Sequence, residues 1–595
     1  MLKSFIRKYF KNFLFFYKRM GHRVFVMVLL TLGVGIMDGL GLSMFLPLFQ
    51  IAADNETQRE AGDGNKIESF MHSVGVSITL QNVLTVMVVF YIFKGLIQFI
   101  KTKYDTDTGR YFMLRTRKRL VTAFSAIHYK YFVTANVGRI QNIMTGELAT
   151  IYNAFTQYVG MIQQFIMVLV YMSFAVVMNA QFSIFITIGG LIFNFLFRRI
   201  YKVTKQSSRQ RVYAANVYQG LIMQFVGNFK YLKSTGLLDK YTLKVNESIE
   251  AIEKENRKMG YMGAISGATR EPILITIVSA VILLQVYLLG GSLSTIIVSL
   301  LFFYRALTAV TFLQLYMNTF NTMIGTLENV SRFEDELTQF KERQTGSKEH
   351  KKLKQGLELR NIEFNYGEKR VLEGINLTIP VNKTIAFVGE SGSGKTTLVN
   401  LISGLLTAET GHYLLDGIPV QELNLKSFQR QIGYVSQDPV IFSDTIYNNV
   451  TFWAEDDASN RARFEDALKR AEMFDYVNKL PDKDQTLLGN NGINLSGGQK
   501  QRISIARELF KDVEVLVFDE ATSALDSETE KAIQANIDEL HGRLTVLIIA
   551  HRLSTVKNAD LIVLLNDGKI VDQASFHVLK DREPRFRKMV ELQEM

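Results

Sequence analysis

The stretch TIAFVGESGSGKTTLVNLISGLL, residues 384–406, decides the fold of the C-terminal part of the chain. Its first half is apolar and reads as a buried strand, and the part after Lys395 reads as a helix. The glycine-rich turn between them has the spacing Gly389-x-x-x-x-Gly394-Lys395-Thr396 of a phosphate-binding loop. In such a loop, backbone N–H groups surround phosphate oxygens, the lysine bridges the terminal phosphates and the threonine hydroxyl ligates Mg²⁺. The sequence therefore predicts a nucleotide site, and the strand–loop–helix setting argues against a chance match.

Strand and helix patterns continue on both sides of this loop and indicate one α/β domain over residues 356–595. The apolar strand VEVLVFDE, residues 513–520, ends in two adjacent carboxylates, which packing alone does not require. We expect Asp519 to hold Mg²⁺ through water and Glu520 to polarise the attacking water. A surface pair of carboxylates is the alternative, and the phosphate-binding loop counts against it.

The N-terminal part is built differently, because it contains six apolar stretches long enough to cross a bilayer. These are residues 24–49, 80–100, 155–178, 182–197, 273–289 and 293–315. The loop 52–78 is acidic, whereas the long connections on the other side are basic, as the positive-inside rule expects of cytoplasmic loops. We therefore expect an all-α membrane domain of six helices over residues 23–330, with two cytoplasmic coupling regions and both termini in the cytoplasm.

Two further segments flank that domain. Residues 1–22 mix Phe and Tyr with Lys and Arg, which predicts an amphipathic helix on the inner membrane surface. Residues 331–355 are highly charged and read as a linker or a helix extension. The net charge of +11 belongs mainly to basic residues beside the apolar stretches, which favours membrane loops over a nucleic-acid partner. The chain has no cysteine, so disulfides and thiolate metal sites are excluded.

The segment LSGGQKQR, residues 495–502, lies between the phosphate-binding loop and the strand that ends in the two carboxylates. It resembles the signature sequence of ABC transporter ATPases. Tyr366, Gln437, the SALD segment 523–526 and His551 follow the order and spacing of the other motifs of that family. Each has a plainer explanation when taken alone, such as a half-buried strand tyrosine, a surface amide or a core histidine. Together they extend the resemblance over the whole C-terminal domain.

The resemblance and the loop chemistry together assign the site residues, with ATP and Mg²⁺ as the expected cofactors. Nucleotide contacts are expected from Tyr366, Gly389, Ser391, Gly392, Ser393, Gly394, Lys395, Thr396, Thr397, Ser496, Gly497, Gly498, Gln499 and Asp526. The metal ligands are expected to be Thr396, Gln437 and Asp519, and the catalytic residues Glu520, Gln437 and His551. In the family arrangement the signature sequence covers the phosphates held by a partner's Lys395, so that two chains complete each site.

Two positions depart from the family pattern. The loop TLLGNNG, residues 486–492, has Asn490 where such exporters often carry an acidic residue. In the family this loop contacts the transmembrane helices, so the change concerns the coupling of hydrolysis to transport and not hydrolysis itself. Asn382 occupies a turn where the family usually has glycine. Asparagine tolerates a left-handed conformation better than most residues, so we expect this turn to be preserved.

The membrane half resembles exporter-type half-transporters, in which six spans precede one ATPase domain. By that resemblance, residues 131–140 and 218–227 hold the short coupling helices, and the working unit is a homodimer. A heterodimer with another half-transporter remains open. Two other classes fit the sequence less well: a soluble ABC ATPase, which the six spans disfavour, and an ABC-type channel or regulator, which the retained Glu520 and His551 disfavour.

Charged residues inside the spans give information about the transported substrate, because a charge within the membrane is energetically costly. Lys94, Arg270 and Arg305 could line a cationic cavity for an anionic cargo, or Asp38 could neutralise one of them. The cations and the pattern GLGLSMFLPLF, residues 39–49, are weakly similar to flippases of lipid-linked oligosaccharides. We therefore expect a lipidic or amphipathic anionic substrate, most simply a lipid-linked saccharide, moved across the bacterial inner membrane, with membrane lipid as a partner. Multidrug, lipid or peptide export by the same fold is the alternative.

Overall fold

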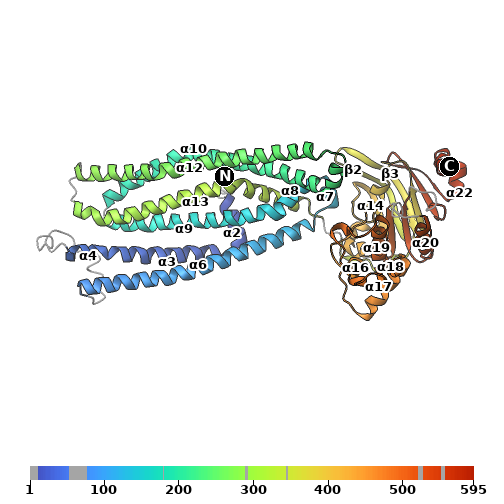
Figure 1. Cartoon of the computed structure of the whole chain (residues 1–595), viewed down its shortest axis with the longest axis horizontal. Coiled ribbons are helices and arrows are strands. Elements are labelled where there is room, and N and C mark those ends of the chain that lie inside the picture. The colour runs from blue at the N-terminus through green and yellow to red at the C-terminus, as the bar shows by residue number, and fades with distance from the viewer. Residues whose placement is uncertain are drawn as a thin grey trace. The chain divides into compact units, whose positions relative to one another are not determined.

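The computed structural model describes residues 11–52, 77–178, 180–287, 293–342, 346–519, 527–550 and 556–594. The chain forms two compact units (Figure 1). The helical unit comprises Met1–Ile127 and Thr134–Lys341, and the α/β unit comprises His128–Val133 and Glu342–Met595. Each unit is described by itself below.

Long helices dominate the helical unit (Figure 1). They are α3 (Arg23–Ser43), α6 (Leu80–Phe124), α9 (Leu148–Met178), α10 (Ala180–Gly227), α12 (Leu238–Tyr287) and α13 (Leu293–Gln339). Shorter elements are α2 (Lys11–Met20), α4 (Phe45–Ala52), α8 (Val137–Asn142), the π-helical turn η2 (Ile143–Glu147) and α11 (Phe229–Ser234). Helix α13 packs against α9 and α10, α10 packs against α12, and α3 packs against α6.

Five of the six predicted spans fall on one of these long helices, whereas the first, 24–49, is divided between α3 and the short helix α4. Within the described residues, four helical segments are long and apolar enough to cross a membrane: Arg23–Ser43, Leu80–Phe124, Val137–Val177 and Leu238–Leu284. The other two predicted stretches, 182–197 and 293–315, lie in α10 and α13, where many side chains fall outside the described part. The helices continue far beyond the apolar stretches, as the sequence predicts for the cytoplasmic connections.

Helix α2 uses its apolar face to pack against other helices. Phe16 is fully buried, and its ring lies 4.7 Å from that of Tyr158 and 5.7 Å from that of Phe112. Arg19 forms an ion pair with Glu334 of α13. The amphipathic pattern predicted for residues 1–22 is thus used against the bundle over Lys11–Met20, and residues 1–10 lie outside the described part.

The segment expected to be a linker, residues 331–355, is divided between the two units. Its first part continues α13 to Gln339, and its later part forms β1 (Lys348–Glu349), which pairs with β7 (Leu423–Asn424) of the α/β unit. The charged composition of this segment suits an exposed helix end as well as a linker, so composition alone could not separate the two possibilities.

The α/β unit is built on a six-stranded sheet with the order β12-β11-β4-β10-β9-β8. The strands are β4 (Thr384–Val388), β8 (Ile432–Val435), β9 (Val515–Asp519), β10 (Thr545–Ile549), β11 (Leu561–Asn566) and β12 (Lys569–Ala574). All neighbouring pairs are parallel except β11 with β12. A second, antiparallel sheet has the order β3-β2-β5-β6 and comprises β2 (Gly356–Tyr366), β3 (Lys369–Pro380), β5 (Thr410–Leu415) and β6 (Ile418–Pro419).

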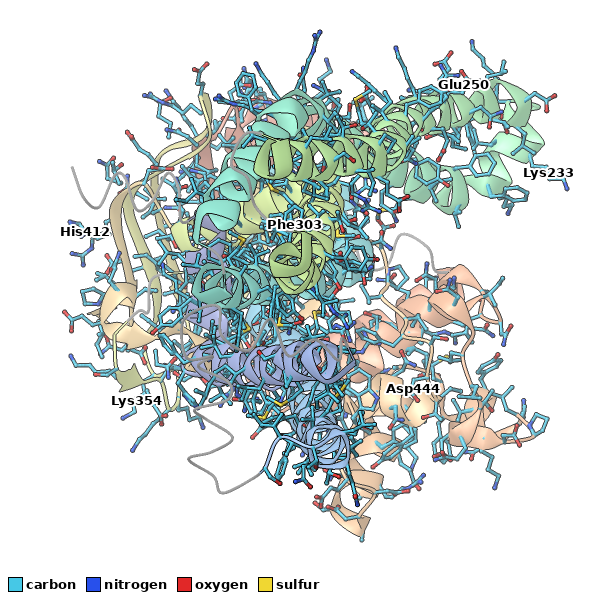
Figure 2. The ribbon with its side chains drawn as sticks, turned by 90° about the vertical axis from the view of Figure 1, so that its left-hand side faces the viewer. Lys233, Glu250, Phe303, Lys354, His412 and Asp444 are labelled. Carbon is cyan, nitrogen blue, oxygen red and sulfur yellow. The ribbon has the colours of Figure 1, made fainter. Side chains whose placement is uncertain are left out.

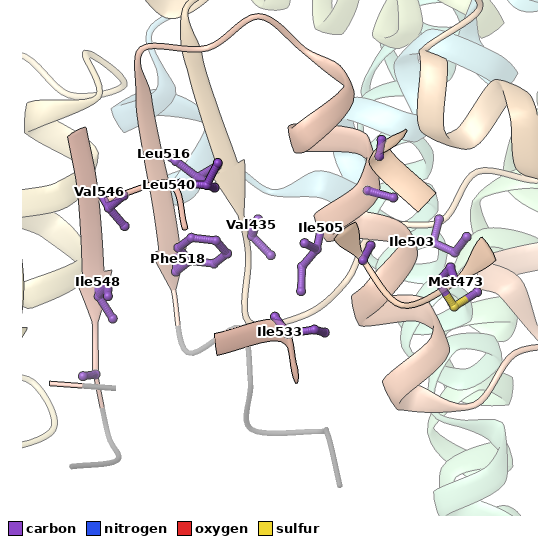
Figure 3. Close-up of a cluster of buried hydrophobic side chains, with 14 of the residues drawn as sticks. Val435, Met473, Ile503, Ile505, Leu516, Phe518, Ile533, Leu540, Val546 and Ile548 are labelled. Carbon is purple, nitrogen blue, oxygen red and sulfur yellow. The ribbon is translucent and has the colours of Figure 1, made fainter. Parts of the chain in front are cut away.

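Side chains of the central strands alternate between two hydrophobic cores, because successive residues of a strand point to opposite faces. Ala386, Leu516, Phe518, Val546 and Ile548 belong to one core, together with Ile503 and Ile505 of α19 (Gly497–Phe510) (Figure 3). The intervening strand residues Ile385, Phe387, Val515, Val517 and Leu547 belong to the other core, together with Leu398 and Val399 of α14 (Lys395–Ile402). Helices α14 and α19 therefore cover opposite faces of the same sheet.

Candidate functional site

The predicted phosphate-binding loop follows β4 and leads into α14. Gly389, Gly392 and Gly394 have φ values of 154°, 83° and 101°, a backbone conformation that side chains rarely allow. A Cβ atom on Gly389 would lie 2.2 Å from the carbonyl oxygen of Leu565, and one on Gly394 would lie 2.9 Å from a methyl carbon of Leu372. The loop therefore needs glycine at these positions.

Two side chains of this loop fit a polyanion. Lys395 is almost fully buried, and its Nζ donates hydrogen bonds to the carbonyl oxygens of Gly389 and Glu390, both at 2.9 Å. Phosphate oxygens are charged acceptors and would bind this ammonium more strongly than neutral carbonyls do. The buried Oγ of Ser393 has no hydrogen-bond partner within the described part of the chain. It can donate to a phosphate oxygen in the loop.

Tyr366 lies at the end of β2 and packs against the hydrophobic core that also contains Leu398 and Val399 of α14. Its ring packs edge-to-face on Phe364 at 4.9 Å. The aromatic ring expected to stack on adenine is thus next to the helix that begins with the phosphate-binding lysine.

The predicted metal ligands follow three parallel strands of the central sheet. Asp519 ends β9, Gln437 lies two residues after β8, and Thr396 begins the helix that follows β4. Because these strands are parallel, their carboxyl ends lie along one edge of the sheet, where ligands of open α/β sheets bind. A hydroxyl, an amide and a carboxylate are oxygen ligands that suit Mg²⁺.

The sequence did not reveal that a tyrosine orients Asp519. The hydroxyl of Tyr434 donates a hydrogen bond to Oδ2 of Asp519 at 3.0 Å. Burial, assisted by the negative charge of Asp519, raises the pKa of Tyr434, so this hydroxyl keeps its proton. The sequence feature that could have predicted this contact is the position of Tyr434 in β8, because β8 lies next to β9 and neighbouring parallel strands bring their side chains together.

The signature sequence begins α19. Ser496 caps this helix by accepting a hydrogen bond from the backbone N–H of Gln499, and the Gln499 side chain accepts one from the N–H of Ser496. This capping box fixes the first turn, with Ser496 and Gly497 exposed and Gly498 and Gln499 half-buried. The phosphate-binding loop leads into the helix on the other face of the sheet, so the structure does not bring the two motifs to one face within the chain.

Three predicted residues, Glu520, Asp526 and His551, lie outside the described residues. Their roles remain predictions.

The structure describes the other predicted positions. Ser391 and Gly392 are exposed in the loop. Asn382 has a φ of 60°, which confirms the left-handed turn expected of it. Asn490 begins a short 3₁₀ turn, Asn490–Gly492.

Among the span residues, the structure supports internal pairing for Asp38. The carboxylate is buried, its Oδ1 lies 2.6 Å from Nζ of Lys94, and its Oδ2 accepts a hydrogen bond from the hydroxyl of Tyr171. Lys94 is therefore engaged with Asp38. Arg270 donates to the carbonyl oxygen of Thr311 at 3.4 Å, and its Nε has no hydrogen-bond partner among the residues that the structure describes.

Arg305 is the third predicted cation, and the described residues give it no ion pair or hydrogen bond. It interacts electrostatically with Tyr91 and Tyr171. Arg305 therefore lies close to the Asp38 cluster without being neutralised by a direct contact.

An exposed aromatic pair was also missed by the sequence reasoning. Phe452 and Trp453 are half exposed, and both have left-handed backbone conformations, with φ of 57° and 61°. The indole N–H of Trp453 donates to Asp444 at 2.7 Å. Asp444 also accepts from Asn448, and these hydrogen bonds, with one from the backbone of Thr445, lower its pKa. Such strain in bulky residues marks a candidate functional surface.

The fold and the site together define a multi-pass membrane protein that carries its own nucleotide-binding domain. The family described as ABC transporter transmembrane region matches residues 24–315, and the ABC transporter family matches residues 372–523. The chain belongs to the ABC transporter family, with the membrane and ATPase domains fused in one polypeptide.

Several relatives carry the name ATP-dependent lipid A-core flippase. One from Pectobacterium atrosepticum is 37% identical over 56% of this chain and 58% of its own length. One from Francisella novicida is 46% identical over 40% of each chain, and one from Salmonella typhimurium is 47% identical over 37% of this chain and 38% of its own. The chain thus spans less than two thirds of the length of these relatives.

A solved structure of a bacterial Atm1-family ABC exporter with ATP bound shares the fold. It superposes with a TM-score of 0.78 over 97% of this chain and 99% of the other, at 21% identity. The expected fold class, an all-α membrane domain plus an α/β ATPase domain, is confirmed.

Proposed function

We propose that this protein is an ATP hydrolase coupled to export or flipping of an amphipathic anionic substrate, working as a homodimer by alternating access. The placement of α14 and α19 on opposite faces of one sheet carries this proposal. A phosphate-binding loop and a capped signature helix that do not meet within one chain can complete two nucleotide sites when a second copy is added. Fusion to the membrane helices supports the link between hydrolysis and transport.

At each site the residues of this chain bind and orient ATP. The loop amides, Lys395 and Ser393 bind the phosphates, and Tyr366 stacks on adenine. Mg²⁺, when held by Thr396, Gln437 and Asp519, would neutralise charge on the phosphates.

Two residues act on the reacting groups in this proposal. Glu520 accepts a proton from the attacking water, and His551 contacts the γ-phosphate. Tyr434 keeps the Asp519 carboxylate oriented through its hydrogen bond at 3.0 Å.

The second copy also explains two exposed surfaces. The short helix α11 exposes Phe229, Tyr231 and the cation Lys233, which Figure 2 shows at an end of the helical unit. The ATPase domain exposes Phe452 and Trp453 beside the carboxylate of Asp444, also labelled in Figure 2. Aromatic faces and opposite charges are complementary, so we assign α11 of one copy to this surface of the other.

For the cargo, the support comes from charge and from the relatives. Arg305 is not neutralised by a described contact, and Arg270 has an unpaired buried Nε. Both could bind an anionic headgroup, whereas Lys94 is engaged with Asp38. Relatives named lipid A-core flippase favour a lipid-linked saccharide, and multidrug, lipid or peptide export is the second candidate. The location that follows is the bacterial inner membrane, with both termini in the cytoplasm.

The test is ATPase stimulation of the reconstituted chain by a panel of lipid-linked glycans, phospholipids, peptides and drugs. We expect lipid-linked glycans to stimulate most, and the double variant Arg270→Ala/Arg305→Ala to lose that stimulation while keeping basal hydrolysis. The exposed Arg198→Ala is the matched control. Unchanged stimulation in the double variant would refute the cargo assignment, and absent basal hydrolysis would refute the transport ATPase itself.

A further inference from the structure

A groove outside the proposed transport path runs along the cytoplasmic extension of α6, beside the end of α13. It has a volume of about 740 Å³. Its cations are Arg115, Lys118, Arg119 and Lys341, and no acidic residue lines it. The first three lie at positions i, i+3 and i+4 of α6, so they share one face of the helix.

These cations are not neutralised. Within the part of the chain that the structure describes, none of the four forms an ion pair with a carboxylate. The nearby Glu334 is already paired with Arg19. Burial lowers the pKa of Arg19, Glu334 opposes this, and the charges of Arg119 and Arg115 lower it further. The groove therefore concentrates positive charge, which favours the binding of an anionic partner.

The upper end of the groove lies level with the start of α3, where the chain passes from the segment 1–22, predicted to be interfacial, into its first apolar stretch. The guanidinium of Arg23, the first residue of the α3 span, lies 3.9 Å from the ring centre of Tyr111, which lines the groove. Arg115 donates to the carbonyl oxygen of Arg19 at 3.2 Å, next to that entry. At a rise of 1.5 Å per residue, Arg115, Lys118 and Arg119 lie about 6 to 12 Å beyond Tyr111.

The opposite end of the groove is much deeper in the cytoplasm. Ile127, three residues beyond the end of α6 at Phe124, pairs with Lys341, which places this lysine roughly 20 Å beyond Tyr111. The headgroup layer of a bilayer leaflet is only about 5 to 8 Å thick. Arg115 therefore lies within reach of lipid headgroups, Lys118 and Arg119 can extend toward them, and Lys341 is too far away.

We propose that the upper part of this groove binds the phosphate headgroup of an anionic phospholipid of the cytoplasmic leaflet. Arg115, Lys118 and Arg119 contact the phosphate, and the half-exposed Leu114 contacts the acyl chain. The first ten residues of the chain are an unsuitable occupant, since they carry three Lys and Arg and no carboxylate. This site is separate from the cargo and nucleotide sites, so it does not depend on the proposed function.

The test is native mass spectrometry of the purified full chain in detergent, titrated with phosphatidylglycerol or phosphatidylcholine. We expect the chain to retain phosphatidylglycerol preferentially. The variant Arg115→Gln/Lys118→Gln/Arg119→Gln should weaken its apparent affinity at least tenfold, since each interfacial cation contributes about fivefold. Arg115→Lys/Arg119→Lys keeps the charges and should remain within about threefold of the parent chain.

The matched control removes three exposed cations from the corresponding part of α10, Arg198, Arg199 and Lys202. Equal weakening by the control would show a general surface-charge effect and overturn the site. A loss caused by Lys341→Gln, or displacement of the lipid by inorganic phosphate, would show a soluble anion as the ligand and overturn it also. If the triple variant does not remain monodisperse, Arg119→Gln decides in the same assay, with about a fivefold loss expected.

Discussion

Replacing Lys94 with methionine tests whether the buried pair with Asp38 is structural. The carboxylate of Asp38 is 2% exposed, and Nζ of Lys94 lies 2.6 Å from it. Removing one partner of a buried pair costs about 3–5 kcal/mol, because the other charge stays buried. The Lys94 side chain is 27% exposed, and the hydroxyl of Tyr171 still binds the carboxylate, so we expect a smaller loss of about 2–3 kcal/mol.

The assay measures the midpoint temperature, at which half of the purified chain in detergent is lost from the monodisperse peak of size-exclusion chromatography. For a domain of this size, the expected loss corresponds to a decrease of roughly 4–12 °C. The double variant Asp38→Asn/Lys94→Met removes both charges and should recover most of the decrease, because no unpaired charge remains. The exposed Lys202→Met is the control and should shift the temperature by less than about 1 °C.

The opposite pattern would refute the structural reading. If Lys94→Met left the midpoint unchanged and removed the stimulation of ATPase by cargo, Lys94 would be a cargo residue, as one of the sequence-based hypotheses had it. If the double variant were less stable than the single variant, the pair would not be the origin of the loss.

Three further predictions concern the ATPase domain. Ser496→Arg should abolish ATP hydrolysis, measured as turnover, while leaving nucleotide binding, measured by the fluorescence of a nucleotide analogue, largely intact. Loss of nucleotide binding would count against a composite site. Glu520→Gln should trap an ATP-bound dimer seen by size-exclusion chromatography, and rapid turnover would exclude it as the general base. Burial of Asp416 opposes ionisation, but hydrogen bonds from the N–H groups of residues 354–356 lower its pKa below the usual value. Its contribution to stability is therefore present above about pH 4 and lost as the pH falls through the lowered pKa, so Asp416→Asn should flatten the acid limb of unfolding curves.

The conformations of the phosphate-binding loop and of the turn at Asn382 were predictable, because each depends on a short continuous segment with fixed local geometry. The glycine spacing of the phosphate-binding loop and the turn at Asn382 are properties of a few neighbouring residues. The pair of Asp38 and Lys94 is different, since 56 positions separate the two residues on different helices. The pair forms only because α3 packs against α6 in this register, and the hydrophobic periodicity of either helix alone does not reveal that register.

Residues 218–227, which were predicted to hold the second coupling helix, do not form a separate short helix in the structure. Residues 218–227 belong to the continuous helix α10, and the separate short helix α11 begins at Phe229. The chain leaves the helical conformation at Asn228, which has φ of −107° and ψ of 21°. The dipeptide Gly227-Asn228 could have predicted the end of α10 at this point, since both residues are weak helix formers and favour a helix end.

The strained pair Phe452 and Trp453 shows why some exposed surfaces cannot be predicted from the sequence. Aromatic residues are expected in strands, yet here both take a left-handed conformation that costs about 1–2 kcal/mol per residue. The hydrogen bond from Trp453 to Asp444 and the contacts of both rings with Phe442, at 5.6 Å, offset that cost. The exposed surface therefore depends on tertiary contacts that no local pattern encodes.

The same contacts connect the proposed docking surface with the nucleotide site. Phe442 and Asp444 lie on the short segment that runs from Gln437, after β8, to α16 (Ile446–Thr451). A shift of the partner's α11 against Phe452 and Trp453 would act on Phe442 and Asp444, and only a few residues separate these from Gln437. In the proposed dimer, this segment is therefore the shortest covalent route between a coupling helix and a metal ligand. In that dimer it would link a membrane movement to hydrolysis without requiring the sheet to deform, since β8 and α16 on either side of it are held by the hydrophobic cores.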